Sequence, residues 1–118
     1  MDGLIVHSNY KGEKVALTTT ETTYYEFRNP SNYQQSYYVD YDNFRFFSFV
    51  LRCNSPQNDW YALTSGIFNS PYYSIYPPKA VDLDSGEAIP LLIQNNILYA
   101  KGGTAGKTYS ISFVIPRA

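Results

Sequence analysis

Few side chains in this sequence could take part in nucleophilic catalysis. There is one histidine, His7, and one cysteine, Cys53, so a Ser-His-Asp or Cys-His unit would have to use them. His7 falls in an expected N-terminal arm, residues 1–12, which is a poor place from which to hold a base against a nucleophile. Cys53 ends an apolar run and is expected to be a small core residue. We therefore expect no enzyme that works through a side-chain nucleophile.

Two close pairs of carboxylates remain, Asp40 with Asp42 and Asp82 with Asp84. Members of such a pair share one face of a strand, and a glycosidase needs two carboxylates across a sugar cleft. Nothing in the sequence places a cleft between them. The stretch DLDSGE around the second pair also departs from the calcium-loop pattern, because its glycine comes one position early. We expect no enzyme, no metal and no cofactor, and a small hydrolase is the least favoured alternative.

Charge and length narrow the range of partners. The chain has 118 residues and a net charge of −1, and its nine lysines and arginines are scattered, so no basic stripe suggests nucleic-acid binding. No apolar run approaches the roughly 20 residues that span a bilayer, so no membrane insertion is expected. One cysteine cannot form a disulfide framework. We expect one domain over residues 1–118, folded in a reducing cytoplasm.

The composition favours strands. Tyrosine occurs 13 times and aromatic residues make up 18% of the chain, and such residues favour pleated, half-buried surfaces. Turn signals recur about every 8–12 residues, as they do in sandwiches and barrels. The sequence therefore predicts an all-β fold, either an antiparallel β-sandwich or a barrel-like, jelly-roll-like domain. The expected strands cover residues 14–20, 23–28, 36–41, 43–53, 60–66, 79–83, 88–93, 97–101 and 107–117.

The strand at residues 43–53 is apolar on both faces. One face carries Phe44, Phe46 and Val50, and the other carries Phe47, Phe49, Leu51 and Cys53. A strand of this kind is covered on both sides. One cover would be the opposite sheet, and the second would be a loop or a neighbouring subunit. Tyr99 and Tyr109 alternate with core residues in later strands, so both are assigned to packing.

The stretch FNSPYYSIYPPKA, residues 68–80, places many rings in a segment that its prolines keep from forming a long strand. Tyrosine combines a flat apolar face with a hydroxyl and loses little side-chain entropy on binding. The rings are expected to plug one end of a sandwich, to contact another subunit, or to form a recognition surface for a saccharide. The residues predicted to contact a ligand are Trp60, Tyr61, Tyr72, Tyr73 and Tyr76, with Asn58 and Asp59 as polar partners.

The order of features in the second part of the chain resembles a known family. The stretches NFRFFSFVLR, a tryptophan after a loop, GIFNSPYYSIYPPKA, SGEAIPLLIQNNILYAKGG and TYSISFVIPRA follow one another over residues 43–118. In order and spacing they resemble the receptor-binding head of tail-tip, baseplate and tail-fibre proteins from long-tailed phages of Gram-positive bacteria. The likeness is one of order and spacing and includes no signature motif.

The resemblance implies a β-sandwich head that binds host cell-wall saccharides without catalysis. It also implies a homotrimer at the tail tip of a virion, assembled in the host cytoplasm beside other tail proteins. The face of Phe44, Phe46 and Val50 would then meet a threefold axis. Two alternatives stay open, namely a structural baseplate or tail accessory protein that makes protein contacts, and a free carbohydrate-binding module.

Overall fold

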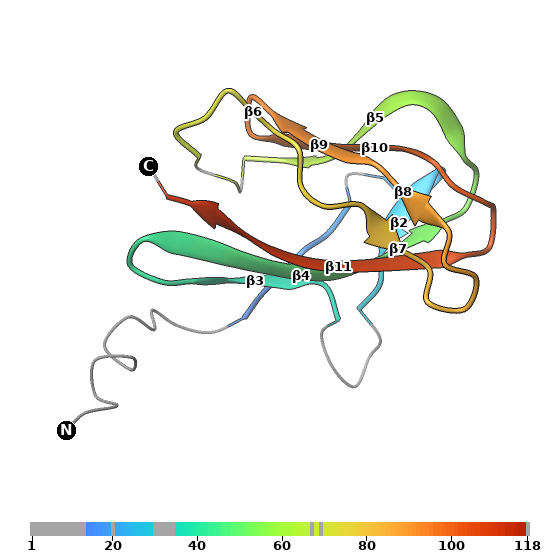
Figure 1. Ribbon diagram of the computed structural model, residues 1–118, viewed down its shortest axis with the longest axis horizontal. Helices are drawn as coiled ribbons and strands as arrows, with labels where there is room; N and C mark the ends of the chain where they lie inside the picture. Colours follow the sequence, from blue (N-terminus) through green and yellow to red (C-terminus); the bar gives the residue numbers. More distant parts are fainter. Residues whose placement is uncertain (1–13, 20, 30–34, 67, 69, 118) are drawn as a thin grey trace.

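The strands of the computed structural model form two antiparallel sheets that face each other (Figure 1). The structure describes residues 14–19, 21–29, 35–66, 68 and 70–117, so the prediction for His7 lies outside the described residues. Among the described residues every regular element is a strand. The predicted antiparallel β-sandwich is therefore confirmed. No helix in this part of the chain could cross a bilayer.

The larger of the two sheets is built around a pair of long strands. Its order is β1 (Val15–Ala16), β3 (Tyr37–Asp40), β4 (Phe44–Cys53), β11 (Thr108–Pro116), β7 (Ala80–Val81) and β8 (Ala88–Ile89), and β2 (Tyr25–Phe27) also pairs with β4. We call it the first sheet. The second sheet has the order β5 (Gln57–Ser65), β10 (Ile97–Gly102), β9 (Leu91–Gln94) and β6 (Ser74–Ile75).

Strand β4 sets the core of the sandwich. Its alternate side chains Phe47, Phe49 and Leu51 are no more than 1% exposed and face the second sheet. Strand β11 runs antiparallel to it along its whole length, with Tyr109 opposite Leu51. The assignment of Tyr109 to packing is confirmed, because its side chain belongs to the buried core. Cys53 continues the buried row of β4 at 0% exposed. The side chains that alternate with this row point away from the second sheet and are only partly buried, namely Phe44, Phe46, Ser48, Val50 and Arg52.

Prolines decide where the chain changes sheets. The segment from β6 to β7 carries Pro77 and Pro78, and β7 pairs with β11 only at Ser110. The expected strand at residues 88–93 is two strands in different sheets, because Pro90 has no N–H to donate and lies between β8 and β9. Strand β5 also begins at Gln57, earlier than expected.

Two turns between strands have backbone conformations that fit their residues. Asn95 and Asn96, between β9 and β10, have positive φ angles of 54° and 62°, which suits a tight hairpin turn. Gly86, between β7 and β8, has a φ of 78°, in the region that glycine adopts without strain. The first turn holds β9 against β10, and the second brings β8 beside β7.

Candidate functional site

The outer face of the second sheet carries an aromatic surface. Leu98 and Ala100 of β10 are buried in the core, so Tyr99 and Lys101 between and after them point outward. Tyr99 lies opposite Leu92 of β9, and the Lys101 ammonium lies 4.7 Å from the centroid of the Trp60 ring. We call Trp60, Leu92, Tyr99 and Lys101 the aromatic face. The assignment of Tyr99 to core packing was wrong, because β10 presents it on the side away from the core.

The aromatic face is well packed at its centre. Leu92 is 6% exposed although it does not belong to the buried core between the sheets. Its side chain is therefore largely covered on the outer side of the sheet. Trp60 and Tyr99 are only half-buried, so each ring keeps surface that a ligand could contact.

A second group of rings flanks β6 at the edge of the same sheet. Tyr72, Tyr73 and Tyr76 are 60%, 67% and 73% exposed. They leave the core because Ile75, opposite Ile93, is the residue of this segment that packs inward. We call residues 70–76 the tyrosine loop.

Hydrogen bonds hold the tyrosine loop to the sheet. The backbone N–H of Tyr72 donates to the Ser70 hydroxyl over 3.0 Å, and that of Asn95 donates to the Tyr73 carbonyl over 3.2 Å. The Gln94 side-chain amide donates to the Ser74 hydroxyl over 3.2 Å. The exposed rings therefore stand on an anchored backbone.

The sheet order separates Trp60 from the tyrosine loop. Strand β5, which carries Trp60, lies at one edge of the second sheet and β6 lies at the other. Three interstrand steps correspond to about 14 Å. The predicted ligand residues therefore do not line one pocket. Asn58 and Asp59 are exposed near Trp60 at the start of β5, and the tyrosine loop borders the far side of the face.

Tyr61 has a different environment from its neighbour Trp60. It lies opposite Ala100 and packs against the core, and its ring centroid is 4.9 Å from that of Tyr24 in an edge-on contact. The pKa of Tyr61 is raised to about 12. The largest cause is the hydrogen bond that its hydroxyl donates to the Glu21 carboxylate, and the second is burial. The structure thus places this predicted ligand residue against the core, away from the aromatic face.

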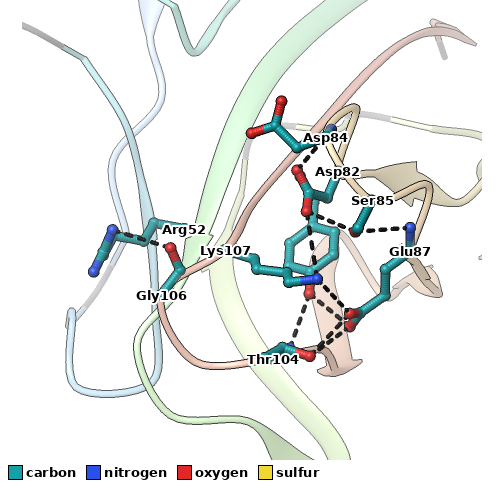
Figure 2. Close-up of polar contacts among 9 residues, drawn as sticks. Arg52, Asp82, Asp84, Ser85, Glu87, Thr104, Gly106 and Lys107 are labelled. Carbon is teal, nitrogen blue, oxygen red and sulfur yellow. Dashed lines mark hydrogen bonds and ion pairs between the residues drawn. The ribbon is translucent and has the colours of Figure 1, made fainter.

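A polar cluster joins the β7–β8 turn to the start of β11 (Figure 2). The Tyr109 hydroxyl donates to Glu87 Oε2 over 2.7 Å and accepts from the Thr104 N–H over 2.8 Å. Lys107 Nζ lies 3.4 Å from Glu87 Oε1 and 3.8 Å from Asp82 Oδ2. Asp82, Glu87 and Lys107 are thus held by one another and by neighbouring hydroxyl groups, and these contacts explain the turn without a ligand.

The predicted carboxylate pairs are also held by their own neighbours. Asp82 is 7% exposed and accepts a 2.8 Å hydrogen bond from the Ser85 hydroxyl, whereas Asp84 is exposed. Asp40 binds Arg45 through both carboxylate oxygens, at 2.5 and 2.9 Å. Within the described ranges, no three His, Cys, Asp or Glu side chains gather as metal ligands would.

The polar cluster predicts loss of stability in acid. The Ser85 hydroxyl is the main cause that lowers the pKa of Asp82, and the Tyr109 hydroxyl is the main cause that lowers the pKa of Glu87 from its ordinary value of 4.5. A lowered folded pKa stabilises the fold above the ordinary value, and this contribution is lost as pH falls through the folded value. We expect the free energy of unfolding, measured in urea, to fall as pH drops below about 4.5.

The variant Glu87→Gln is expected to lose less stability than the wild type over that pH range. Asp84→Asn is the matched control, because Asp84 is an exposed carboxylate of the same turn. An equally steep acid loss in Glu87→Gln and wild type would show that Glu87 does not contribute to it.

The outer face of the first sheet carries the residues predicted to meet another subunit. Phe44, Phe46 and Val50 point outward from β4 and are partly exposed, and Val114 opposite Phe46 is 55% exposed. A groove of about 240 Å³ continues this face toward the β7–β8 turn. It is lined by Val50, Val81, Asp82, Leu83, Asp84, Thr108 and Ser110.

Comparisons with known proteins give no assignment. No protein family matches the chain, and neither a curated protein nor a solved structure matches it. Function is therefore inferred from the residues of this chain and from where the fold places them.

Proposed function

We propose that the protein is a non-catalytic recognition module that binds a saccharide across the outer face of the second sheet. The observation that carries this proposal is the exposure of Tyr72, Tyr73 and Tyr76, 60–73%, on an anchored loop beside the aromatic face. Contact between rings of this size and water is unfavourable in free energy unless a partner covers the rings. Their position at the edge of the second sheet suits an extended ligand.

The chemistry of the surface fits sugar rings. Tyrosine and tryptophan offer apolar faces against which sugar C–H groups can stack, and each also has a polar tip for a hydroxyl. The aromatic face and the tyrosine loop bound one sheet about 14 Å wide, which is wider than one ring. Pro71 within the loop and Pro77 directly after it stiffen the backbone, and a stiff loop loses less entropy when it binds.

The resemblance of residues 43–118 to phage receptor-binding heads suggests the biological setting. We propose a component of a phage adhesion device at the tail tip of a virion, where it would recognise a cell-wall saccharide of the host. The outward position of Phe44, Phe46 and Val50 supports a contact with further copies or with other tail proteins. A homotrimer is the proposed assembly.

A binding panel tests the recognition function. Purified protein is titrated calorimetrically with cell-wall polysaccharides of Gram-positive bacteria. The variants Tyr99→Ala and Tyr72→Ala/Tyr73→Ala are each expected to bind about tenfold more weakly, because each removes apolar contact area. The control Val114→Ala removes exposed apolar surface from the opposite sheet and is expected to bind like wild type.

Two results would count against recognition by this face. One is a calorimetric titration with excess polysaccharide in which no heat of binding is measured. The other is binding that is equal in wild type and in both correctly folded tyrosine variants. In either case, the second candidate function would take precedence.

The second candidate is a structural tail or baseplate accessory protein. The partly exposed apolar face of β4 and β11 is the observation that favours it. Light scattering on a sizing column separates the candidates, since a stable trimer of 13.5 kDa chains supports the receptor-binding head. A monomer that co-purifies with tail proteins and ignores polysaccharide would support the accessory role.

A further inference from the structure

We infer that Lys101 makes the aromatic face selective for saccharides that carry a negative charge. This inference rests on the proposed saccharide-binding function and adds the chemical class of the ligand. It starts from the 4.7 Å distance between the Lys101 ammonium and the Trp60 ring. The ammonium occupies one face of the indole, so a sugar that stacks on that face must move it.

Lys101 is one of very few charged residues in the strands of the second sheet. The four strands of this sheet contain only two charged residues, Asp59 and Lys101. The ion pairs among the described residues lie elsewhere, in the Arg45–Asp40 contact and in the polar cluster around Lys107. Within the part of the chain that the structure describes, Lys101 therefore has an aromatic ring but no carboxylate as its partner.

When an anionic sugar binds, the Lys101 ammonium would exchange its cation–π contact for a stronger hydrogen bond to the anion. A cation–π contact at an exposed site is weak, whereas a hydrogen bond between an ammonium and an anion is assisted by both charges. A carboxylate or phosphate could thus draw Lys101 off the ring, and the freed indole face would accept the sugar. A neutral sugar must displace the ammonium without this compensation.

The fluorescence of Trp60 can be used to follow this exchange. It is the only tryptophan in the chain, so intrinsic tryptophan fluorescence reports on this ring alone. If Lys101 leaves the indole when an anion binds, the emission of Trp60 must change. A ligand that binds only at the tyrosine loop would leave the emission of Trp60 near its starting value.

The test uses matched pairs of oligosaccharides. Tetragalacturonate is compared with its methyl ester, and a phosphate-bearing mannose oligosaccharide with its phosphatase-treated form. We expect each acidic form to bind about fivefold more tightly than its neutral partner and to shift the Trp60 emission. This preference is expected to shrink as salt is added. If one acidic pair shows the preference and the other does not, the result identifies the anion.

Two lysine variants test whether Lys101 causes the preference for the acidic forms. In Lys101→Gln, the acidic and neutral forms are expected to bind equally well. Lys79→Gln changes the net charge by the same amount, but Lys79 is exposed beside β7 of the first sheet, so this variant should keep the preference. Circular dichroism of the free variants verifies that both are folded.

The outcomes separate this inference from the function on which it rests. Equal binding of acidic and neutral forms by wild type would overturn the role of Lys101 and leave saccharide recognition intact. The same conclusion follows if only neutral polysaccharides bind, or if Lys101→Gln retains the preference. If no saccharide of either kind binds, the proposed function fails, and the inference fails with it.

Discussion

Replacing Phe47 with alanine is expected to lower the free energy of unfolding by about 3–5 kcal/mol. The Phe47 ring is fully buried, and its centroid lies 5.0 Å from that of Phe68 and 5.3 Å from that of Phe113, both in stacked geometry. The substitution removes these contacts and leaves a cavity that rigid strands fill poorly. Urea unfolding followed by circular dichroism measures the loss.

Phe46→Ala is the matched control for this substitution. Phe46 is the preceding residue of β4 but points to the outer face, where it is only half-buried. Its replacement is expected to cost less than about 2 kcal/mol. If the two variants lose the same stability, then the two sides of β4 do not differ in packing as the structure requires.

Tyr109→Phe is expected to cost about 1–3 kcal/mol, although the ring stays in place. The Tyr109 hydroxyl is buried between its acceptor, Glu87 Oε2, at 2.7 Å and its donor, the Thr104 N–H, at 2.8 Å. Without the hydroxyl, both of these groups lose a hydrogen-bond partner. The free energy of unfolding near neutral pH measures the effect.

Tyr99→Phe supplies the comparison for the buried hydroxyl. Tyr99 points outward from β10, so water can replace its hydrogen bonds, and the expected change is within about 0.5 kcal/mol. A loss for Tyr109→Phe as small as that for Tyr99→Phe would mean that the cluster around Glu87 adds little to stability.

The sequence predicted the fold class and most strands because both depend on local patterns. The inward row of β11 alternates with Ser110 and Ser112 between Tyr109 and Phe113 and could be assigned by period alone. The Asn95–Asn96 turn was visible for a similar reason, since asparagine tolerates positive φ. Pro90 was a visible interruption, but its consequence, a change of sheet, depends on partners that a local pattern does not specify.

The candidate site was harder to predict because it depends on which strands are neighbours. Tyr99 lies between Leu98 and Ala100, and a strand with apolar residues on both faces does not reveal which face meets the core. Tyr61 and Trp60 are adjacent in sequence, yet they point to opposite sides of β5. The distance from Trp60 to the tyrosine loop follows from the order β5-β10-β9-β6, and β9 and β10 come much later in the chain.

The pairing of β4 with β11 has a consequence for how the chain is made. Ser48 and Ser112 lie opposite each other in these strands, although 64 residues separate them. Contacts of such long range slow folding, because a large loop must close before they form. A ribosome must therefore complete β11 before the central pair can assemble. Until then, one edge of β4 lacks its partner strand, and an unpaired edge of this kind favours aggregation of the incomplete chain.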